Sequence, residues 1–186
     1  MGIVTLLDDT TRPKAPKIEG VTAGQRQMGQ RLALFHRYHL QQLQAVGKVM
    51  QRVAEGTDEP AQIGNAISGM QMTSNYRYFG NLCGQECQAL TAHHTIEDHY
   101  IFPPLHAKGS AGLKKVIDRL REEHLVIHQT LDSLEAAAMA AIQNPGAETF
   151  APLKVIFLQL EKLVKSHFGY EEAELEEALG YYGIEI

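Results

Sequence analysis

Three histidines and two carboxylates lie within seven positions in the stretch from His93 to His99. On an α-helix, residues four apart lie on the same face, so His93 and Glu97 point in one direction. A histidine and a glutamate placed in this way can hold one metal ion, and the carboxylate can also bridge to a second ion. Because many surface helices combine histidine with glutamate, the interpretation depends on the other histidines of the chain.

Histidines on three further segments fall in line with apolar residues at helical spacing. His124 and His128 interrupt an apolar stripe, and His167 is followed four residues later by Glu171. The first helix supplies His36 or His39. Its stripe has His39 at the centre and His36 about 60° to one side, and either could reach the axis of a bundle. The stripe of that helix consists of Met28, Leu32, Phe35, His39, Leu43, Val46, Met50 and Val53.

These polar side chains need partners if they face a core, because an unsatisfied buried polar group costs about 1–3 kcal/mol. A shared metal site would satisfy all of them. The set is too large for one ion and fits two ions bridged by two carboxylates. Mixed imidazole and carboxylate ligands suit iron, manganese or zinc. The predicted ligands are His36 or His39, His93, Glu97, His124, His128, His167 and Glu171.

Two competing metal-site patterns are absent from the sequence. Ferritin-like di-iron bundles use Glu-x-x-His on two helices, and no histidine here has a glutamate three residues before it. Zinc proteases use His-Glu-x-x-His, whereas the residues between His124 and His128 are all apolar. The general-base glutamate of such a protease is therefore missing.

Helical periodicity accounts for most of the chain. It predicts helices over 23–54, 73–102, 111–142 and 148–178, with a further short helix over 60–69. Pro103 and Pro104 are expected to stop the second long helix. No β-type alternation of useful length occurs. The prediction is an all-α protein with an up-down-up-down four-helix bundle at 23–180, a mobile rather than packed N-terminal arm at 1–22, and a C-terminal tail at 181–186.

Composition excludes several classes of partner. The chain has 186 residues, 44% of them hydrophobic, and a net charge of −5, which gives no reason to expect nucleic acid. No apolar run approaches the roughly 20 residues of a membrane span, and the N-terminus has no secretory pattern. A cytoplasmic protein that binds no membrane is the expectation.

The motifs resemble those of the hemerythrin family, in its bacterial HHE cation-binding branch, over roughly residues 24–178. The second helix carries His93-His94-Thr95-Ile96-Glu97-Asp98 followed by Phe102-Pro103. The third carries Glu122-Glu123-His124 with His128, and the fourth carries His167-Phe168-Gly169-Tyr170-Glu171-Glu172. This resemblance implies a hemerythrin-like bundle that holds two non-haem irons joined by an oxo or hydroxo bridge.

The resemblance also implies roles for individual residues. His124, His128 and His167 would bind one iron, and His93 and the first-helix histidine would bind the other. Glu97 and Glu171 would bridge the two. The family register fits His36 better, while the apolar stripe favours His39, so both stay candidates. In the oxygen carriers of the family the last carboxylate follows the histidine by five residues, which corresponds to Glu172 in this chain. In the bacterial branch it follows by four, which corresponds to Glu171, and Glu171 is favoured.

The function implied is the binding of a small molecule, namely dioxygen, nitric oxide or peroxide, at the di-iron centre. The alternatives are a redox enzyme that removes peroxide or nitric oxide, an iron-handling protein, and a purely structural bundle. Tyr38, Tyr100 and Tyr170 lie within a turn of predicted ligands and are candidates for iron ligation, although a packed tyrosine with a satisfied hydroxyl is the simpler interpretation. The remaining histidines, His94, His99 and His106, are expected to point outward or to support the ligands.

Overall fold

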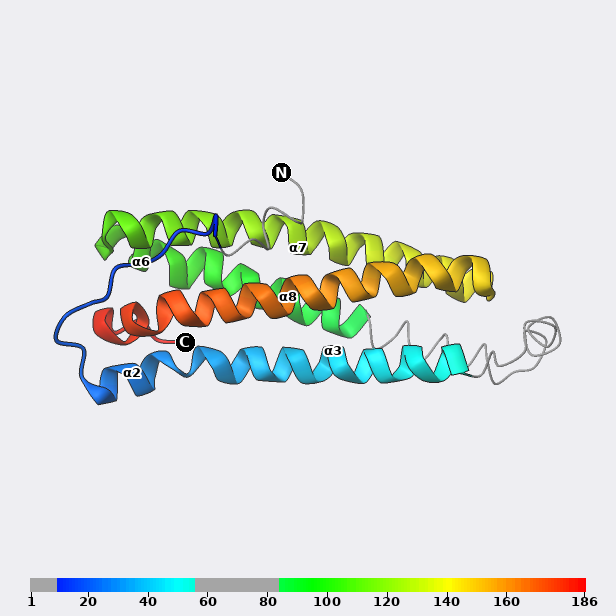
Figure 1. Ribbon diagram of the computed structural model, residues 1–186, viewed down its shortest axis with the longest axis horizontal. Helices are drawn as coiled ribbons and strands as arrows, with labels where there is room; N and C mark the ends of the chain where they lie inside the picture. The colour runs from blue at the N-terminus through cyan, green and yellow to red at the C-terminus, as the bar shows by residue number, and fades with distance from the viewer. Residues whose placement is uncertain (1–9, 56–83) are drawn as a thin grey trace. The chain divides into compact units, whose positions relative to one another are not determined.

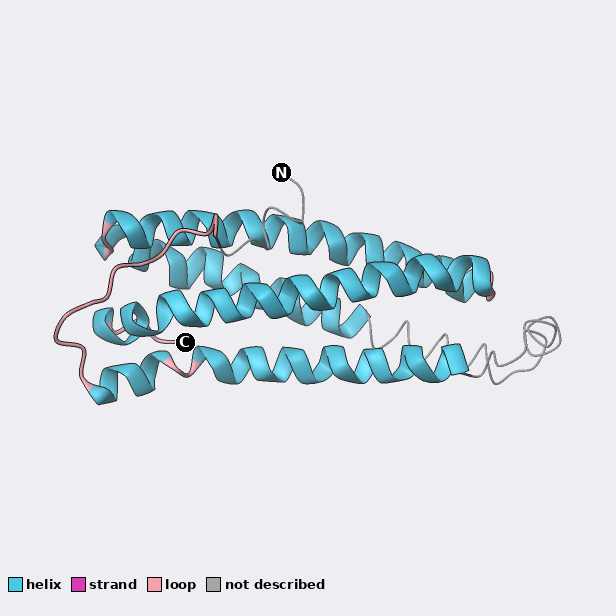
Figure 2. Cartoon of the chain, viewed as in Figure 1, coloured by secondary structure: helices cyan, strands magenta, loops and turns pink. Residues whose placement is uncertain are grey.

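A computed structural model of the chain describes residues 10–55 and 84–186. Within these ranges the chain forms helices and no strand (Figure 2), so the prediction of an all-α protein is confirmed. Residues 84–96 are helical and lead into the π-helix η1. The elements are α2 (Ala23–Gly29), α3 (Leu32–Glu55), η1 (Glu97–Ile101), α6 (Phe102–Lys108), α7 (Ala111–Gln143) and α8 (Ala147–Tyr182), and Figure 1 labels the α-helices among them.

The chain divides into two compact units, to each of which α3, α7 and α8 contribute. The first contains the described parts of Met1–Tyr38, Thr91–Ile127 and Leu163–Ile186; the second contains those of His39–Leu90 and His128–Lys162. The core of the first unit is formed by Leu32, Ile101, Phe102, Leu105, Leu113, Val116, Ile117, Leu120, Tyr170, Leu175, Ala178, Leu179 and Ile184. Buried residues of the second include Leu43, Val46, Met50, Val53, Leu90, Leu131, Leu134, Leu153, Phe157 and Leu160.

The first predicted helix is two helices, because the chain turns at residues 30–31. Thr22 caps α2 in a capping box with Gln25, which fixes where that helix begins. At the end of α2, a Cβ atom on Gly29 would collide with the backbone carbonyl of Glu176 in α8. Gly180 is related in the same way to the backbone of Gln25. The two glycines let α2 lie directly against the last turns of α8.

The expectation that Pro103 and Pro104 end the second helix is wrong. Both prolines lie in the first turn of α6, where a backbone N–H has no helical partner to lose, and the helix continues to Lys108. The preceding π-helix η1 accommodates them, since the N–H of Phe102 donates to the carbonyl of Glu97, five residues back. The predicted start of this helix at 73 and the predicted helix over 60–69 lie outside the described residues.

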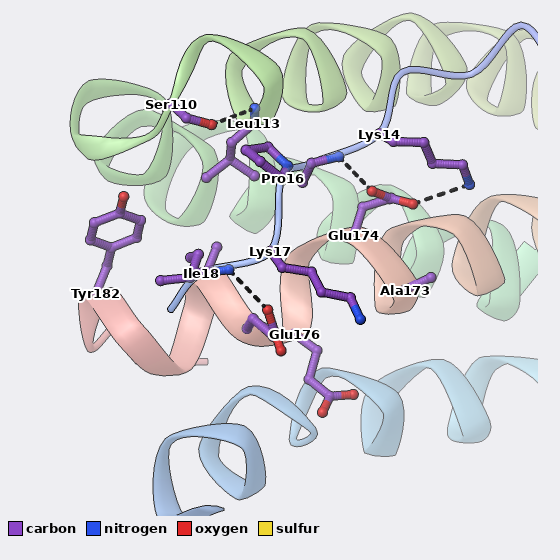
Figure 3. Close-up of a pocket in the computed structure, with 13 residues that line it drawn as sticks. Lys14, Pro16, Lys17, Ile18, Ser110, Leu113, Ala173, Glu174, Glu176 and Tyr182 are labelled. Atoms are coloured by element: carbon purple, nitrogen blue, oxygen red, sulfur yellow. Dashed lines mark hydrogen bonds and ion pairs between the residues drawn. The ribbon is translucent and has the colours of Figure 1, made fainter. Parts of the chain in front are cut away.

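The last two helices agree closely with the predicted ranges. The Oγ atom of Ser110 accepts a hydrogen bond from the backbone N–H of Leu113 (3.2 Å), which caps α7 at its start (Figure 3). The final helix runs to Tyr182, four residues beyond the predicted end at residue 178. Gly183 follows with a φ of 63°, the left-handed conformation that commonly ends a helix. Among the described residues, no helix has the length and apolar character needed to cross a membrane.

The described part of the N-terminal arm is packed against α7 and α8, contrary to the expectation of a mobile arm. Tyr170 in α8 donates a hydrogen bond to the carbonyl of Pro13 (2.7 Å). The backbone N–H of Ala15 donates to Glu174 (2.6 Å), which also pairs with Lys14 (3.1 Å; Figure 3). The arm is therefore part of the first unit.

Candidate metal centre

One group of possible metal ligands consists of His36, His93 and Glu97, all in the first unit. His36 lies in α3, His93 in the helical residues 84–96, and Glu97 begins η1. One ligand atom of each residue lies within 4.8 Å of the others. The Nε2 atom of His93 is 3.1 Å from Oε1 of Glu97, and that of His36 is 3.9 Å from the same oxygen. The group is large enough and close enough to hold an ion.

A second group in the same unit consists of His94, His124 and His167. Their ligand atoms also lie within 4.8 Å of one another. All three side chains are at most 1% exposed, and the rings of His94 and His124 stack with their centroids 4.1 Å apart. Three buried imidazoles converging in this way form a nitrogen-rich site.

Two buried glutamates lie between the groups. The Oε2 atom of Glu97 is 3.5 Å from Nε2 of His124, although Oε1 of the same carboxylate lies in the first group. The Oε2 atom of Glu171 is 3.4 Å from Nε2 of His36 and 3.7 Å from Nε2 of His167. Each carboxylate therefore reaches a histidine of both groups, as a bridging ligand must.

Several of these atoms are buried without a hydrogen-bond partner among the described residues. They are both carboxylate oxygens of Glu97, both of Glu171, and the Nε2 atoms of His36 and His167. Buried polar atoms are nearly always hydrogen-bonded, so a cluster of unsatisfied acceptors calls for an explanation. A shared set of metal ions would satisfy all of them, and the donor set of imidazole and carboxylate fits such ions.

In three of the histidines, a carboxylate lies within hydrogen-bond distance of Nδ1, the ring nitrogen that faces away from the centre of the cluster. The Nδ1 atom of His36 is 2.9 Å from Glu172, that of His124 is 3.1 Å from Asp98, and that of His167 is 3.0 Å from Glu123. An Nδ1–H that donates to a carboxylate leaves the lone pair on Nε2, which is the atom directed to the centre. This arrangement is typical of metal-ligating histidines, because it fixes both the tautomer and the orientation of the ring.

The electrostatics of the metal-free cluster favour positive charge at its centre. Burial lowers the pKa of His36, but the carboxylates of Glu171, Glu172 and Glu97 around its ring outweigh burial and raise that pKa to about 11. Burial and the charge of Glu171 raise the pKa of Glu97 well above its ordinary value. Burial and the nearby His124 lower the pKa of His167 well below its ordinary value. Without metal, a proton on His36 supplies part of the positive charge that ions would bring.

The structure brings together most of the predicted ligands and separates the two first-helix candidates. His36, His93, Glu97, His124, His167 and Glu171 all belong to the cluster just described. His39 belongs to the second unit, where its Nδ1 atom is 2.9 Å from buried Glu86. His128 is half-buried and is in neither group of possible ligands.

The acidic and tyrosine candidates are separated as well. Glu171 lies between the histidine groups, while Glu172 binds the far side of His36. Tyr38 and Tyr100 are 54% and 73% exposed, and Tyr170 is buried with its hydroxyl bonded to the arm. Tyr170 thus has the packed environment that the simpler interpretation describes.

Sequence reasoning missed His94. It is fully buried in the second group of possible ligands, so of the two expectations for it, an outward or a supporting position, the outward one is wrong. The signal available was its position beside His93: neighbours on a helix are about 100° apart, so a helix directed between two sites can give one histidine to each. The supporting roles of Asp98, Glu123 and Glu172 were also missed. Each is the immediate sequence neighbour of a residue in the cluster.

The sequence matches the hemerythrin HHE cation binding domain over residues 28–179. The chain therefore belongs to this family, and the suspected relationship is confirmed. Its fold is the all-α bundle expected of such a domain, and its histidine and glutamate groups have the geometry to hold metal cations. The comparisons with curated proteins and with solved structures gave no significant match.

Proposed function

We propose that this protein binds two iron ions at a carboxylate-bridged centre and uses them to bind or react with dioxygen, nitric oxide or peroxide. The observation that carries the proposal is the position of Glu97 and Glu171. Each carboxylate lies within 4 Å of a histidine from both groups, and none of its oxygens has a hydrogen-bond partner within the described chain. A single-ion site would not require either carboxylate to span two groups.

The ligand count differs between the two ions. One would be held by His36 and His93, and the other by His94, His124 and His167. Glu97 and Glu171 would serve both. An ion beside His36 and His93 would thus have one protein ligand fewer, which would leave more room there for a small molecule. When bound, a pair of ferrous ions can supply one electron each to such a molecule.

Iron is the metal that the donor set and the family favour. Neither group contains a thiolate, which argues against a structural cysteine-type zinc site. Histidine together with bridging glutamate is the ligation of di-iron carboxylate bundles. The matching family model describes a cation-binding domain, and the resemblance of the motifs to the hemerythrin family implies that the cation is iron.

The surroundings of His36 and His93 favour binding of a small apolar molecule. The ring of Phe168 stacks on His36 with centroids 3.9 Å apart and meets His93 edge-on at 5.7 Å. Phe168 is itself buried, so it forms an apolar wall. The His93 side chain, which is 10% exposed, marks the side from which a small molecule would enter. Of the tyrosines that could donate a proton in an enzyme, Tyr38 and Tyr100 are exposed, and the hydroxyl of Tyr170 binds the carbonyl of Pro13.

The test is to measure metal content and then reactivity. Protein produced with iron supplied is expected to contain about two irons per chain. It is then reduced without air, and the visible spectrum is recorded as dioxygen or nitric oxide enters. A reversible spectral change supports binding. Immediate, irreversible oxidation with peroxide turnover would instead support the enzyme. Ready loss of iron to a mild chelator would support iron handling.

Two matched variants test the bridging role: Glu171→Gln is the test and Glu172→Gln is its control. The two residues are neighbours of equal size and charge, but only Glu171 lies between the histidine groups. Glu171→Gln should lose most of the iron, while Glu172→Gln should keep it and bind it about 10- to 100-fold more weakly. Wild-type protein with less than half an iron per chain, or with zinc in place of iron, would contradict the proposal.

A further inference from the structure

Arg12 of the N-terminal arm is buried and forms a two-point ion pair. It is 4% exposed, and its Nε and Nη2 atoms each lie 2.9 Å from a different oxygen of Glu123 in α7. Its Nη1 atom donates to the hydroxyl of Ser166 in α8 (2.9 Å). The guanidinium also lies over the ring of Tyr170, 4.7 Å from the centroid. A planar guanidinium held at so many points has little freedom to move.

The same carboxylate holds His167. The Oε2 atom of Glu123, which accepts from Arg12, also accepts from Nδ1 of His167 at 3.0 Å. Glu123 is fully buried, and Arg119 adds a longer contact of 3.6 Å to its other oxygen. A continuous chain of contacts therefore runs from the arm through Glu123 to a histidine of the second ligand group.

The other two carboxylates that bind Nδ1 atoms are in a different situation. Asp98, beside His124, is 29% exposed, and Glu172, beside His36, is 37% exposed. Solvent can stabilise both of these carboxylates. Glu123 is shielded from solvent, so its orientation and its charge depend on arginines. The closer of these, Arg12, comes from a segment more than one hundred residues away in sequence.

We propose that Arg12 is a positioning residue for His167: by fixing the carboxylate of Glu123, it keeps the imidazole directed at the metal centre and tightens metal binding there. The metal part of this inference rests on the proposed function. The orientation of His167 does not, because the contacts exist in the protein without metal. Without the two-point pair, Glu123 could rotate away from His167, and the ring would lose its fixed tautomer.

The arm offers a matched control at a second attachment. Lys14 pairs with Glu174 at 3.1 Å, but Lys14 is 62% exposed. That carboxylate accepts a hydrogen bond from the backbone N–H of Ala15 (Figure 3), and it pairs with no histidine among the described residues. It lines a pocket of about 540 Å³ that contains no residue of the metal centre. Lys14 also lies over the ring of Tyr170, 5.6 Å from the centroid, but it pairs with neither Glu123 nor His167. Lys14→Gln therefore removes an arm contact and a positive charge but leaves the pairs from Arg12 through Glu123 to His167 in place.

The experiment compares Arg12→Gln, Arg12→Lys and Lys14→Gln with the wild type. In metal-free protein, ¹H–¹⁵N NMR of the imidazoles reports the tautomer of His167. We expect an Nδ1–H tautomer in the wild type and in Lys14→Gln, and a mixture of tautomers in Arg12→Gln. In iron-loaded protein, release of one iron to a chelator should be about tenfold faster in Arg12→Gln. Arg12→Lys keeps the positive charge but cannot form the two-point pair with Glu123, so its tautomer mixture and its rate of iron release should both be intermediate.

Each outcome supports or overturns the inference. A wild-type tautomer together with wild-type iron release in folded Arg12→Gln would overturn it. Equal effects from Lys14→Gln would also overturn it, because they would mean that any loosening of the arm suffices. Circular dichroism checks folding, and if Arg12→Gln does not fold, Arg12→Lys decides by the same two measurements. If the wild type holds no iron, the proposed function fails, and the NMR comparison alone decides the role of Arg12.

Discussion

His36 and His39 lie one turn apart on α3 and differ in what surrounds them. Both are buried, at 0% and 5% exposure, and both place Nδ1 2.9 Å from a carboxylate, Glu172 for one and Glu86 for the other. Only His36 belongs to a ligand group, and its Nε2 atom lies within 4 Å of two further carboxylates. Burial and a hydrogen-bonded ring therefore do not identify a metal ligand. Convergence of several donors on one point does.

The charged groups around His36 also differ from those around His39. Nδ1 of His39 lies beside the carboxylate of Glu86. Two further buried carboxylates, those of Glu97 and Glu171, lie within 4 Å of Nε2 of His36. Burial and His124 lower the pKa of the nearby His167 well below its ordinary value, so the positive charge beside these carboxylates rests largely on His36, and bound cations would add to it.

The largest expected effect is the difference between substituting His36 and substituting His39. In the proposed two-ion centre His36→Ala would remove a ligand, so one of the two ions should bind more than about 100-fold more weakly, beyond what loss of a supporting residue costs. His39→Ala should keep both irons and instead lower the free energy of unfolding by about 1–3 kcal/mol, because Glu86 is left buried without its partner. Iron content by elemental analysis and urea unfolding measure the two effects.

The reverse pattern would contradict this assignment. If His39→Ala lost iron while His36→Ala kept it, the centre would use the histidine that the apolar stripe favours. Leu43→Ala, in the second unit, serves as a stability control, because it also weakens a buried core but removes no polar group.

A smaller effect should separate His94 from His128. His94 lies with His124 and His167, so His94→Ala should weaken binding of the second ion by about 100-fold or less, because two histidines and two carboxylates remain. His128→Ala should leave iron content unchanged, since His128 is in neither ligand group. Titration of metal-free protein with ferrous iron measures both. Iron loss in His128→Ala would restore the ligand set that the family motif implied.

These contrasts show where sequence periodicity was sufficient. The ranges of α7 and α8 were predicted closely, because each is a long amphipathic helix with clear boundaries. The side chains that face inward were also mostly predicted, since His124, His167 and Glu171 interrupt apolar stripes. Side chains that lie one helical position off the stripe, such as His36 and His94, could not be assigned, because the rotation of a helix about its axis depends on its neighbours.

Phe35 is an example of that rotation. It belongs to the predicted apolar stripe of the first helix, but it is 47% exposed, and the adjacent His36 is fully buried. A register shift of one residue turns a helix by about 100°, which is enough to replace a phenylalanine by a histidine on the inner face. Similarly, the π-helix η1 depends on a five-residue hydrogen bond that no composition pattern indicates. The packing of the N-terminal arm against α7 and α8 was not predicted, because its contacts are polar and join residues distant in sequence.

The smallest expected effect concerns the pair of His39 and Glu86 and its pH dependence. Burial raises the pKa of Glu86, and the hydrogen bond from His39 only partly offsets this. A carboxyl whose pKa is raised by folding binds more protons in the folded state, so it contributes stability at low pH that is lost as pH rises above about 4.5. Glu86→Gln removes this contribution, and the free energy of unfolding should then fall less steeply between about pH 4.5 and neutrality.

The change in slope cannot exceed about 1.4 kcal/mol per pH unit, the value for one proton. It should be the same in iron-loaded and metal-free protein, because Glu86 binds no metal in this interpretation. Glu97, whose pKa is also raised by burial, should behave differently: bound ions would hold it ionised, so Glu97→Gln should change the slope in metal-free protein. Urea unfolding across this pH range, with and without iron, separates the two glutamates. An effect of Glu86→Gln that depended on iron would place His39 and Glu86 within the influence of the metal centre and remove the distinction between His36 and His39.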